Sequence, residues 1–135
     1  MFCNLKIYIE QNKREISAII DTGNFLRDPI TKTPVVVVEK DNLKDIIPDV
    51  ILENLISIIN GKEIELGEYA SKIRVIPFKS LGKENGLLVG IKINKVEIEY
   101  LDTLHKNNNV ILGIYNGKLS RSGKYSGLIG IDIIT

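Results

Sequence analysis

The apolar residues of this chain occur in short stretches, and this pattern constrains the fold more than any other feature of the sequence. The longest uninterrupted run of Val, Ile and Leu is Val35 to Val38. Gly, Pro, Asp and Asn residues separate the stretches. Such runs bounded by turn residues are typical of strands, and none approaches the ~18 apolar residues of a membrane span. We therefore expect a mainly β fold.

Most of the stretches are predicted to be strands. Leu5, Ile7 and Ile9 alternate with polar residues, which predicts a strand that a polar turn at 11–14 connects to a second strand at 15–20. Further strands are expected at 35–38, 73–78, 87–93, 96–101, 110–113 and 127–135, with a turn at 28–34 and a hairpin loop between Gly82 and Gly86.

One segment has the period of a helix. Ile51, Leu55, Ile58 and Ile59 fall at i, i+4, i+7 and i+8, which is the apolar stripe of an amphipathic helix. Pro48 or Asp49 is a suitable first residue, with the aspartate as a cap, and Asn60-Gly61 is a suitable stop. We expect one substantial helix over 49–60.

Composition limits the domain count and the classes of function. A chain of 135 residues, 44% hydrophobic and 26% charged, predicts one folded domain, 1–135, and excludes a disordered tail. A net charge of +1 does not favour nucleic-acid binding; Lys118, Arg121 and Lys124 are interpreted as a solvated surface. Cys3 is the only cysteine and His105 the only histidine, so the sequence excludes an internal disulfide and a zinc site. We expect His105 on a surface loop, and no metal or other cofactor.

Asp21-Thr22-Gly23 is the motif that indicates chemistry. An Asp-Thr/Ser-Gly triplet occurs by chance in roughly 5% of chains of this length, but here it directly follows the apolar strand end Ala18-Ile19-Ile20. In that place a carboxylate is held at the tip of a buried strand. Asp and Gly also favour tight turns for conformational reasons. The alternative is therefore a β-rich interaction domain in which the triplet is only a structural turn.

The triplet has a definite chemical interpretation. Two carboxylates held face to face share one proton, so that one acts as general base on water while the other polarises a peptide carbonyl. Thr22 would lock the turn through its hydroxyl, Gly23 would allow close approach, and Asn24 would support the turn. The chain has one such triplet, so a second copy must supply the other aspartate across a two-fold axis. An enzyme of this kind is an obligate homodimer.

Several blocks of the sequence, in order across nearly the whole chain, carry a family resemblance. They are residues 19–24, 26–31, 34–35, 74–82, 86–88 and 112–120. The sequence of these blocks resembles the sporulation sigma-E factor processing peptidases of endospore-forming bacteria. The resemblance implies an aspartic endopeptidase with the closed β-barrel of retroviral-type proteases, homodimeric, with Asp21 catalytic. Leu112-Gly113 resembles the apolar-Gly element behind the active-site turn of those proteases.

The resemblance also implies a cellular setting. The substrate would be the precursor of a sporulation sigma factor, cut near its N terminus. A signal protein secreted by the forespore would be the activator of the full-length protein. This domain would follow N-terminal membrane helices and lie, itself soluble, on the cytoplasmic side in the mother cell.

A retroviral-type protease also needs a glycine-rich flap over its cleft. The expected flap is the loop from Lys79 through Ser80, Leu81 and Gly82 to Gly86, and the rival segment is 61–72. The apolar residues 128–134 look like an exposed edge strand, which would favour pairing across a dimer.

Overall fold

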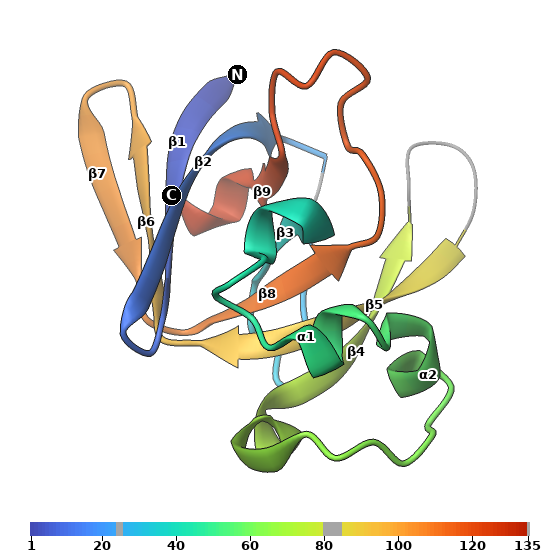
Figure 1. Ribbon diagram of the computed structural model, residues 1–135. Helices are drawn as coiled ribbons and strands as arrows, with labels where there is room; N and C mark the ends of the chain where they lie inside the picture. Colours follow the sequence, from blue (N-terminus) through green and yellow to red (C-terminus); the bar gives the residue numbers. More distant parts are fainter. Residues whose placement is uncertain (24–25, 80–84, 135) are drawn as a thin grey trace.

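The computed structural model describes residues 1–23, 26–79 and 85–134 (Figure 1). The strands are β1 Phe2–Ile9, β2 Asn12–Asp21, β3 Val35–Glu39, β4 Ile73–Lys79, β5 Asn85–Ile93, β6 Lys95–Tyr100, β7 Thr103–Asn107, β8 Val110–Tyr115 and β9 Gly127–Gly130. The helices are α1 Asp49–Leu52 and α2 Leu55–Ile59, and the 3-10 turns are η1 Lys40–Leu43, η2 Gly67–Lys72 and η3 Ile131–Ile133. The predicted β class is confirmed.

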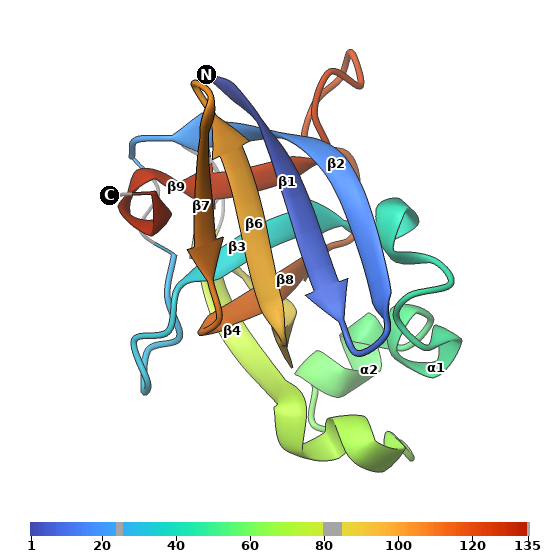
Figure 2. The same ribbon diagram turned by 90° about the vertical axis from the view of Figure 1, so that its left-hand side faces the viewer.

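The strands form one sheet in the order β4-β5-β8-β3-β9-β2-β1-β6-β7. Most neighbours are antiparallel, whereas β2 pairs with β9 and β3 pairs with β8 in parallel. The sheet is so strongly twisted that β7, β6, β1 and β2 cross over β9, β3 and β8 (Figure 2). Two parts of a single sheet therefore face each other and enclose the core.

Strand β3 is buried on both faces, and this explains its uninterrupted valines. Val36 and Val38 contribute to the main core, together with β1, β2, β6, β8 and the helices. Val35 and Val37 contribute to a second apolar cluster with Ile76, Leu88 and Ile111. A strand that is covered on both faces has a continuous run of apolar residues, rather than apolar residues that alternate with polar ones.

The expected closed barrel is wrong, because the sheet is open. Strands β4 and β7 end its order and are not paired with each other in the described part of the chain. The side chains of β7 are exposed or half-buried throughout, so this strand offers little apolar surface for closure. The core is completed instead by Ile51, Leu55, Ile58 and Tyr69, from α1, α2 and η2.

The expected single helix is divided into α1 and α2. It begins at Asp49 and ends before Asn60-Gly61, as predicted, with Gly61 at a φ of 75°. The Asp49 cap is not formed, since the N-cap residue is Pro48. The break lies at Asn54, whose side-chain amide donates to the Val50 carbonyl at 2.8 Å while its backbone N–H bonds Ile51. This side chain replaces the helical backbone bond to Val50.

The C-terminal segment is also shorter as a strand than expected. Strand β9 ends at Gly130 and the chain turns into η3, where Asp132 pairs with Arg27. Strand β9 lies between β2 and β3 inside the sheet, so residues 128–134 do not form an exposed edge. Ile131, Ile133 and Ile134 pack against the main core instead.

Two turns explain the remaining differences. The first hairpin turns at Glu10, with a φ of 52°, and β2 already begins at Asn12, so the predicted turn at 11–14 is too late. Strand β7 was not expected, because Leu104 is its only apolar residue. It pairs with β6 after a turn in which Leu101 and Asp102 both have positive φ. His105 therefore lies, half-buried, on an edge strand rather than a loop.

No helix in the described ranges is long and apolar enough to span a membrane.

Candidate active site

Asp21 is the last residue of β2 and lies opposite Gly130 of β9. Its side chain is half-buried, and its Oδ1 accepts a hydrogen bond from the backbone N–H of Gly23 at 2.9 Å. Thr22 and Gly23 are exposed. A Cβ on Gly23 would come within 3.5 Å of Asp21 Oδ1, an ordinary contact, so a single chain has room for a side chain there.

A tight hairpin follows the Asp21 turn. Val35 donates its N–H to Leu26 at 3.0 Å, and Asp28 donates its N–H to Thr33 at 2.9 Å. Asp28 is buried, and its Oδ1 accepts hydrogen bonds from the N–H groups of Ile30 at 2.8 Å and Thr31 at 3.4 Å. The predicted turn at 28–34 is thus confirmed, and a buried carboxylate organises it.

The environment of Asp28 favours its ionised form. The hydrogen bond from Ile30, with smaller contributions from Thr31 and from the charge of Arg74, holds the pKa of Asp28 below its usual range, although burial acts in the opposite direction. Arg74 Nε lies 3.6 Å from Asp28 Oδ2. Asp28, seven residues beyond Asp21, is therefore ionised at neutral pH.

Two ion pairs fasten this hairpin to the rest of the fold. Asp28 pairs with Arg74 at the start of β4, and Arg27 pairs with Asp132 in η3. Arg27 also donates from Nη1 to the Lys32 carbonyl at 2.7 Å. The segment after Asp21 is consequently held from both sides.

Strands β4 and β5 form a two-stranded arm. Strand β5 pairs with β8 only from Val89 to Ile93, whereas its pairing with β4 continues to Lys79 and Asn85. Residues 76–79 and 85–88 therefore extend past β8, with Ile76 and Leu88 at the base still buried against Val35 and Val37. The expected flap residues Lys79 and Gly86 lie on this arm, while Ser80, Leu81 and Gly82 lie outside the described residues, as does Asn24.

The rival flap segment lies elsewhere. Lys72 of η2 pairs with Glu10 at 2.8 Å, and Glu10 is in the turn at the start of β2. Asp21 is at the opposite end of this ten-residue strand, roughly 30 Å away along it. In both views η2 lies in the lower part of the molecule and β2 ends in the upper part (Figures 1 and 2).

Gly113 lies on β8 beside β3, where it pairs with Val37. A Cβ there would come within 3.0 Å of Val35 Cγ1 and 3.2 Å of Leu88 Cδ1. A side chain at this position would therefore force Val35 or Leu88 to shift by a few tenths of an ångström. Leu112-Gly113 thus packs the strand that follows the Asp21 hairpin.

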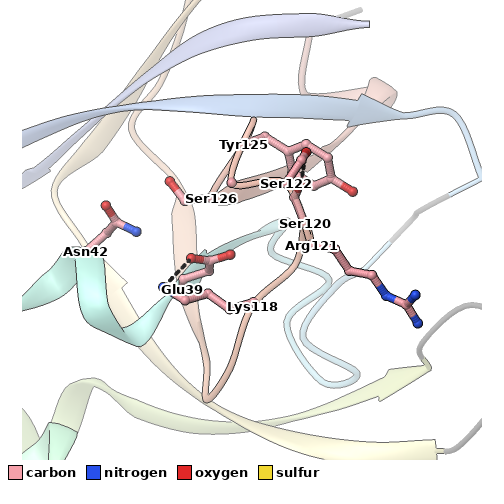
Figure 3. Close-up of a pocket in the computed structure, with 9 residues that line it drawn as sticks. Glu39, Asn42, Lys118, Ser120, Arg121, Ser122, Tyr125 and Ser126 are labelled. Atoms are coloured by element: carbon pink, nitrogen blue, oxygen red, sulfur yellow. Dashed lines mark hydrogen bonds and ion pairs between the residues drawn. The ribbon is translucent and has the colours of Figure 1, made fainter.

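A separate polar pocket of about 380 Å³ lies between β3, η1 and the β8–β9 loop. Glu39 is buried at its wall, accepts the N–H of Leu119 at 2.7 Å and faces Lys118 at 3.7 Å, while Arg121 extends away (Figure 3). The N–H of Ser126 bonds Ser17, four residues before Asp21 and roughly 13 Å from it along β2. The pocket is not part of the Asp21 turn.

The sequence motif located Asp21, but it did not identify the charged residues around it. Arg27, Asp28, Arg74 and Asp132 were not assigned a role, because their pairing depends on the sheet order. The Asp-Pro dipeptide at 28–29 was the one local signal, and it indicated only a turn. Within the described ranges, no three His, Cys, Asp or Glu side chains are grouped so as to hold a metal ion.

Comparison with known proteins gives a consistent family assignment. Residues 1–133 match the family described as Sporulation factor SpoIIGA. The chain is 32% identical over 134 residues to a protein of Priestia megaterium and 31% identical over 121 residues to one of Bacillus subtilis, both named sporulation sigma-E factor-processing peptidase. It is 31% identical over 127 residues to a putative sporulation sigma factor-processing peptidase of Bacillus thuringiensis.

The chain corresponds to only part of most of these relatives. The alignments include 97%, 84% and 93% of this chain for the Priestia, B. subtilis and B. thuringiensis proteins, but 43%, 38% and 79% of the relatives themselves. The chain thus spans less than half of the first two. No solved structure matches the fold significantly.

Proposed function

This chain belongs to the family of the sporulation factor SpoIIGA, and from this we propose that it is the catalytic domain of a sigma-E factor-processing peptidase that works by an aspartic mechanism. The observation that carries the proposal is the place of Asp21. It ends a strand inside the sheet, it is half-buried, and its carboxylate is oriented by the Gly23 N–H. The family match extends over this whole region.

The reaction needs two such carboxylates, and we propose that two copies of the chain supply them across a two-fold axis. One Asp21 is ionised and takes a proton from a bound water, while the other donates its proton to the peptide carbonyl oxygen. The water oxygen bonds to the carbonyl carbon and gives a gem-diol. The carbon–nitrogen bond then breaks as the amine takes a proton from one aspartate and the other aspartate takes a proton from a gem-diol hydroxyl, which leaves a carboxylic acid, an amine and a dyad that again holds one shared proton.

The β4–β5 arm supports the assignment of Lys79–Gly86 as the covering flap. Residues 76–79 and 85–88 of the arm extend past β8, whereas Lys72 in the rival segment 61–72 is paired with Glu10, at the other end of β2. A peptide substrate would add as an extended strand between the arm and the Asp21 turns. The proposed substrate is the N-terminal segment of a sigma-E precursor, since relatives are named for processing that factor.

The family resemblance supports a proposal about the location and the activator of the full-length protein. In the proposed full-length protein, membrane helices precede this domain and hold it at the cytoplasmic face of the mother-cell membrane. Tethering there would raise the local concentration of copies and favour the dimer. A signal protein from the forespore would act on the membrane part.

The proposal is tested by Asp21→Asn, measured as cleavage of a sigma-E precursor by the purified chain and in cells that express both proteins. The amide cannot take the proton, so cleavage should stop while the fold is retained. Asp102→Asn is the matched control, because Asp102 lies in the exposed β6–β7 turn with positive φ, which asparagine tolerates. Substantial cleavage by a folded Asp21→Asn chain would exclude the aspartic mechanism, and inhibition of the native chain by a pepstatin-type inhibitor would support it.

A further inference from the structure

The two oxygens of the buried Asp28 carboxylate contact different parts of the fold. Oδ1 accepts the N–H groups of Ile30 and Thr31 and so shapes the hairpin after the Asp21 turn. Oδ2 faces Arg74 Nε at 3.6 Å. The turn itself needs only the hydrogen bonds to Oδ1, whereas the ion pair of Oδ2 with Arg74 connects this hairpin to β4.

Arg74 sits where the β4–β5 arm begins. Its Nη1 donates to the carbonyls of Ser71 at 3.1 Å and Ile73 at 2.9 Å, so one side of the guanidinium holds the junction of η2 and β4. Across the arm it pairs with Gly90. A Cβ on Gly90 would come within 2.8 Å of Ile111 Cγ2, so the base of the arm is packed without spare room.

Backbone pairing with other strands does not fix the direction of the arm, because beyond Val89 β5 is paired only with β4 among the described strands. Apolar packing holds the base of the arm, where Ile76 and Leu88 are buried against Val35 and Val37. The orientation of the arm relative to the Asp21 turn is therefore set at this base, by that packing and by the polar contacts beside it. The Asp28–Arg74 pair joins that base to the hairpin that follows Asp21.

We propose that Asp28 and Arg74 are positioning residues, which set the β4–β5 arm against the Asp21 turn so that a peptide held by the arm meets the carboxylates. This inference rests on the proposed function. The Arg74 side chain is 38% exposed, so solvent screens the pair. The Asp28 side chain is only 4% exposed, but it keeps the N–H groups of Ile30 and Thr31 as partners when Arg74 is replaced. The expected consequence of losing the pair is misalignment rather than unfolding, and misplacement by ~1 Å can reduce turnover about 100-fold.

The kinetic test compares the native chain with Asp28→Asn, Arg74→Gln and the double variant. Asparagine keeps the acceptor for Ile30 and Thr31 but loses the charge, so the turn is retained. Each single variant should lower kcat at least about tenfold with KM nearly unchanged, and the double variant should be no worse than either. Arg74→Lys should recover part of the loss. Arg14→Gln is the matched control, because Arg14 likewise joins two elements by donating to the Asn42 and Lys44 carbonyls.

A second measurement reports the geometry without any cleavage. Spin labels are attached at Ile30→Cys on the hairpin and Leu87→Cys on the arm, positions that are 87% and 48% exposed, in chains with Cys3→Ala. The distance distribution between the labels should be narrow in the native and Arg14→Gln backgrounds and broader or shifted in Asp28→Asn and Arg74→Gln. Unchanged distances in folded variants, or losses that multiply in the double variant, would overturn the inference. Failure of the Asp21 mechanism would appear separately, as cleavage by Asp21→Asn, while the label distances still test the pair.

Discussion

Arg27 and Asp132 form an ion pair across 105 positions of the sequence. Arg27 follows the Asp21 turn, and Asp132 follows β9, whose Gly130 lies opposite Asp21. The ion pair therefore joins the segment that follows β2 to the segment that follows β9, the two strands that are paired at Asp21. Asp21 is held by elements from both ends of the molecule.

Removing this pair should loosen the surroundings of Asp21 more than the whole fold. Arg27→Gln is expected to lower the free energy of unfolding by no more than about 1 kcal/mol, since the pair is partly exposed. Hydrogen exchange should nevertheless become faster at the backbone amides of η3 and β9. Lys44→Gln, which removes the exposed pair with Asp41, is the control. Equal protection of η3 in both variants would contradict this role for Arg27.

The strands could be predicted because their signals are local. In β1 apolar and polar residues alternate, which indicates that one face is buried. In β3 four consecutive valines indicate that both faces are buried. The division of the helix depends on one side chain, Asn54, which competes with the backbone for the Val50 carbonyl. An apolar stripe continues across such a break, so the period alone does not reveal it. Strand β7 contains one apolar residue, Leu104, and so has no apolar alternation that would predict a strand.

The candidate site was predictable only in part, for the same reason. Asp21 belongs to a motif of adjacent residues. Its supporting pairs, Arg27 with Asp132 and Asp28 with Arg74, join segments that only the sheet order brings together. The open edge likewise follows from which strands end the sheet, and no single segment encodes that order.

Asp28 gives the stability a defined pH dependence. Its pKa is lowered in the folded chain, so its contribution to stability is fully present above the usual aspartate pKa of about 3.9 and is lost as pH falls through the lower folded value. Asp28→Asn removes this contribution. The difference in urea midpoint between the native chain and Asp28→Asn should be constant from pH 6 to 5 and should shrink below about pH 4. A difference that grows on acidification would contradict the depressed pKa.

Glycine is required at position 90 for packing. An alanine Cβ would come within 2.8 Å of Ile111 Cγ2 and 3.0 Å of Ile76 Cγ1, and overpacking of this kind typically costs about 1–3 kcal/mol. Gly86→Ala on the same strand is the control, because its Cβ would meet only the Phe78 carbonyl at 4.0 Å. Gly90→Ala should therefore lower the urea midpoint and Gly86→Ala should not. Equal midpoints would mean that β4 and β8 relax around the added methyl.

The flap assignment predicts different effects for two glycines. Gly82→Pro should reduce turnover, because it restricts the loop that we propose covers the substrate. Gly67→Ala should leave turnover unchanged in the folded fraction, although the φ of 57° at Gly67 strains alanine and lowers stability. Both are measured by cleavage of a precursor peptide, normalised to folded protein. Full turnover by Gly82→Pro beside a crippled Gly67→Ala would move the flap to 61–72.

The shared site predicts how two joined copies behave. Residues 128–134 give no exposed edge for dimerisation, since β9 is inside the sheet, so the case for a dimer rests on the need for two Asp21 carboxylates. Joining two copies by a flexible linker makes their association intramolecular, with an effective concentration in the millimolar range. The joined protein should cleave a precursor at dilutions where separate chains are inactive. A joined protein with Asp21→Asn in one copy should be as inactive as one with both replaced. If it keeps half the activity, each chain has a complete site of its own and the two-fold arrangement is wrong.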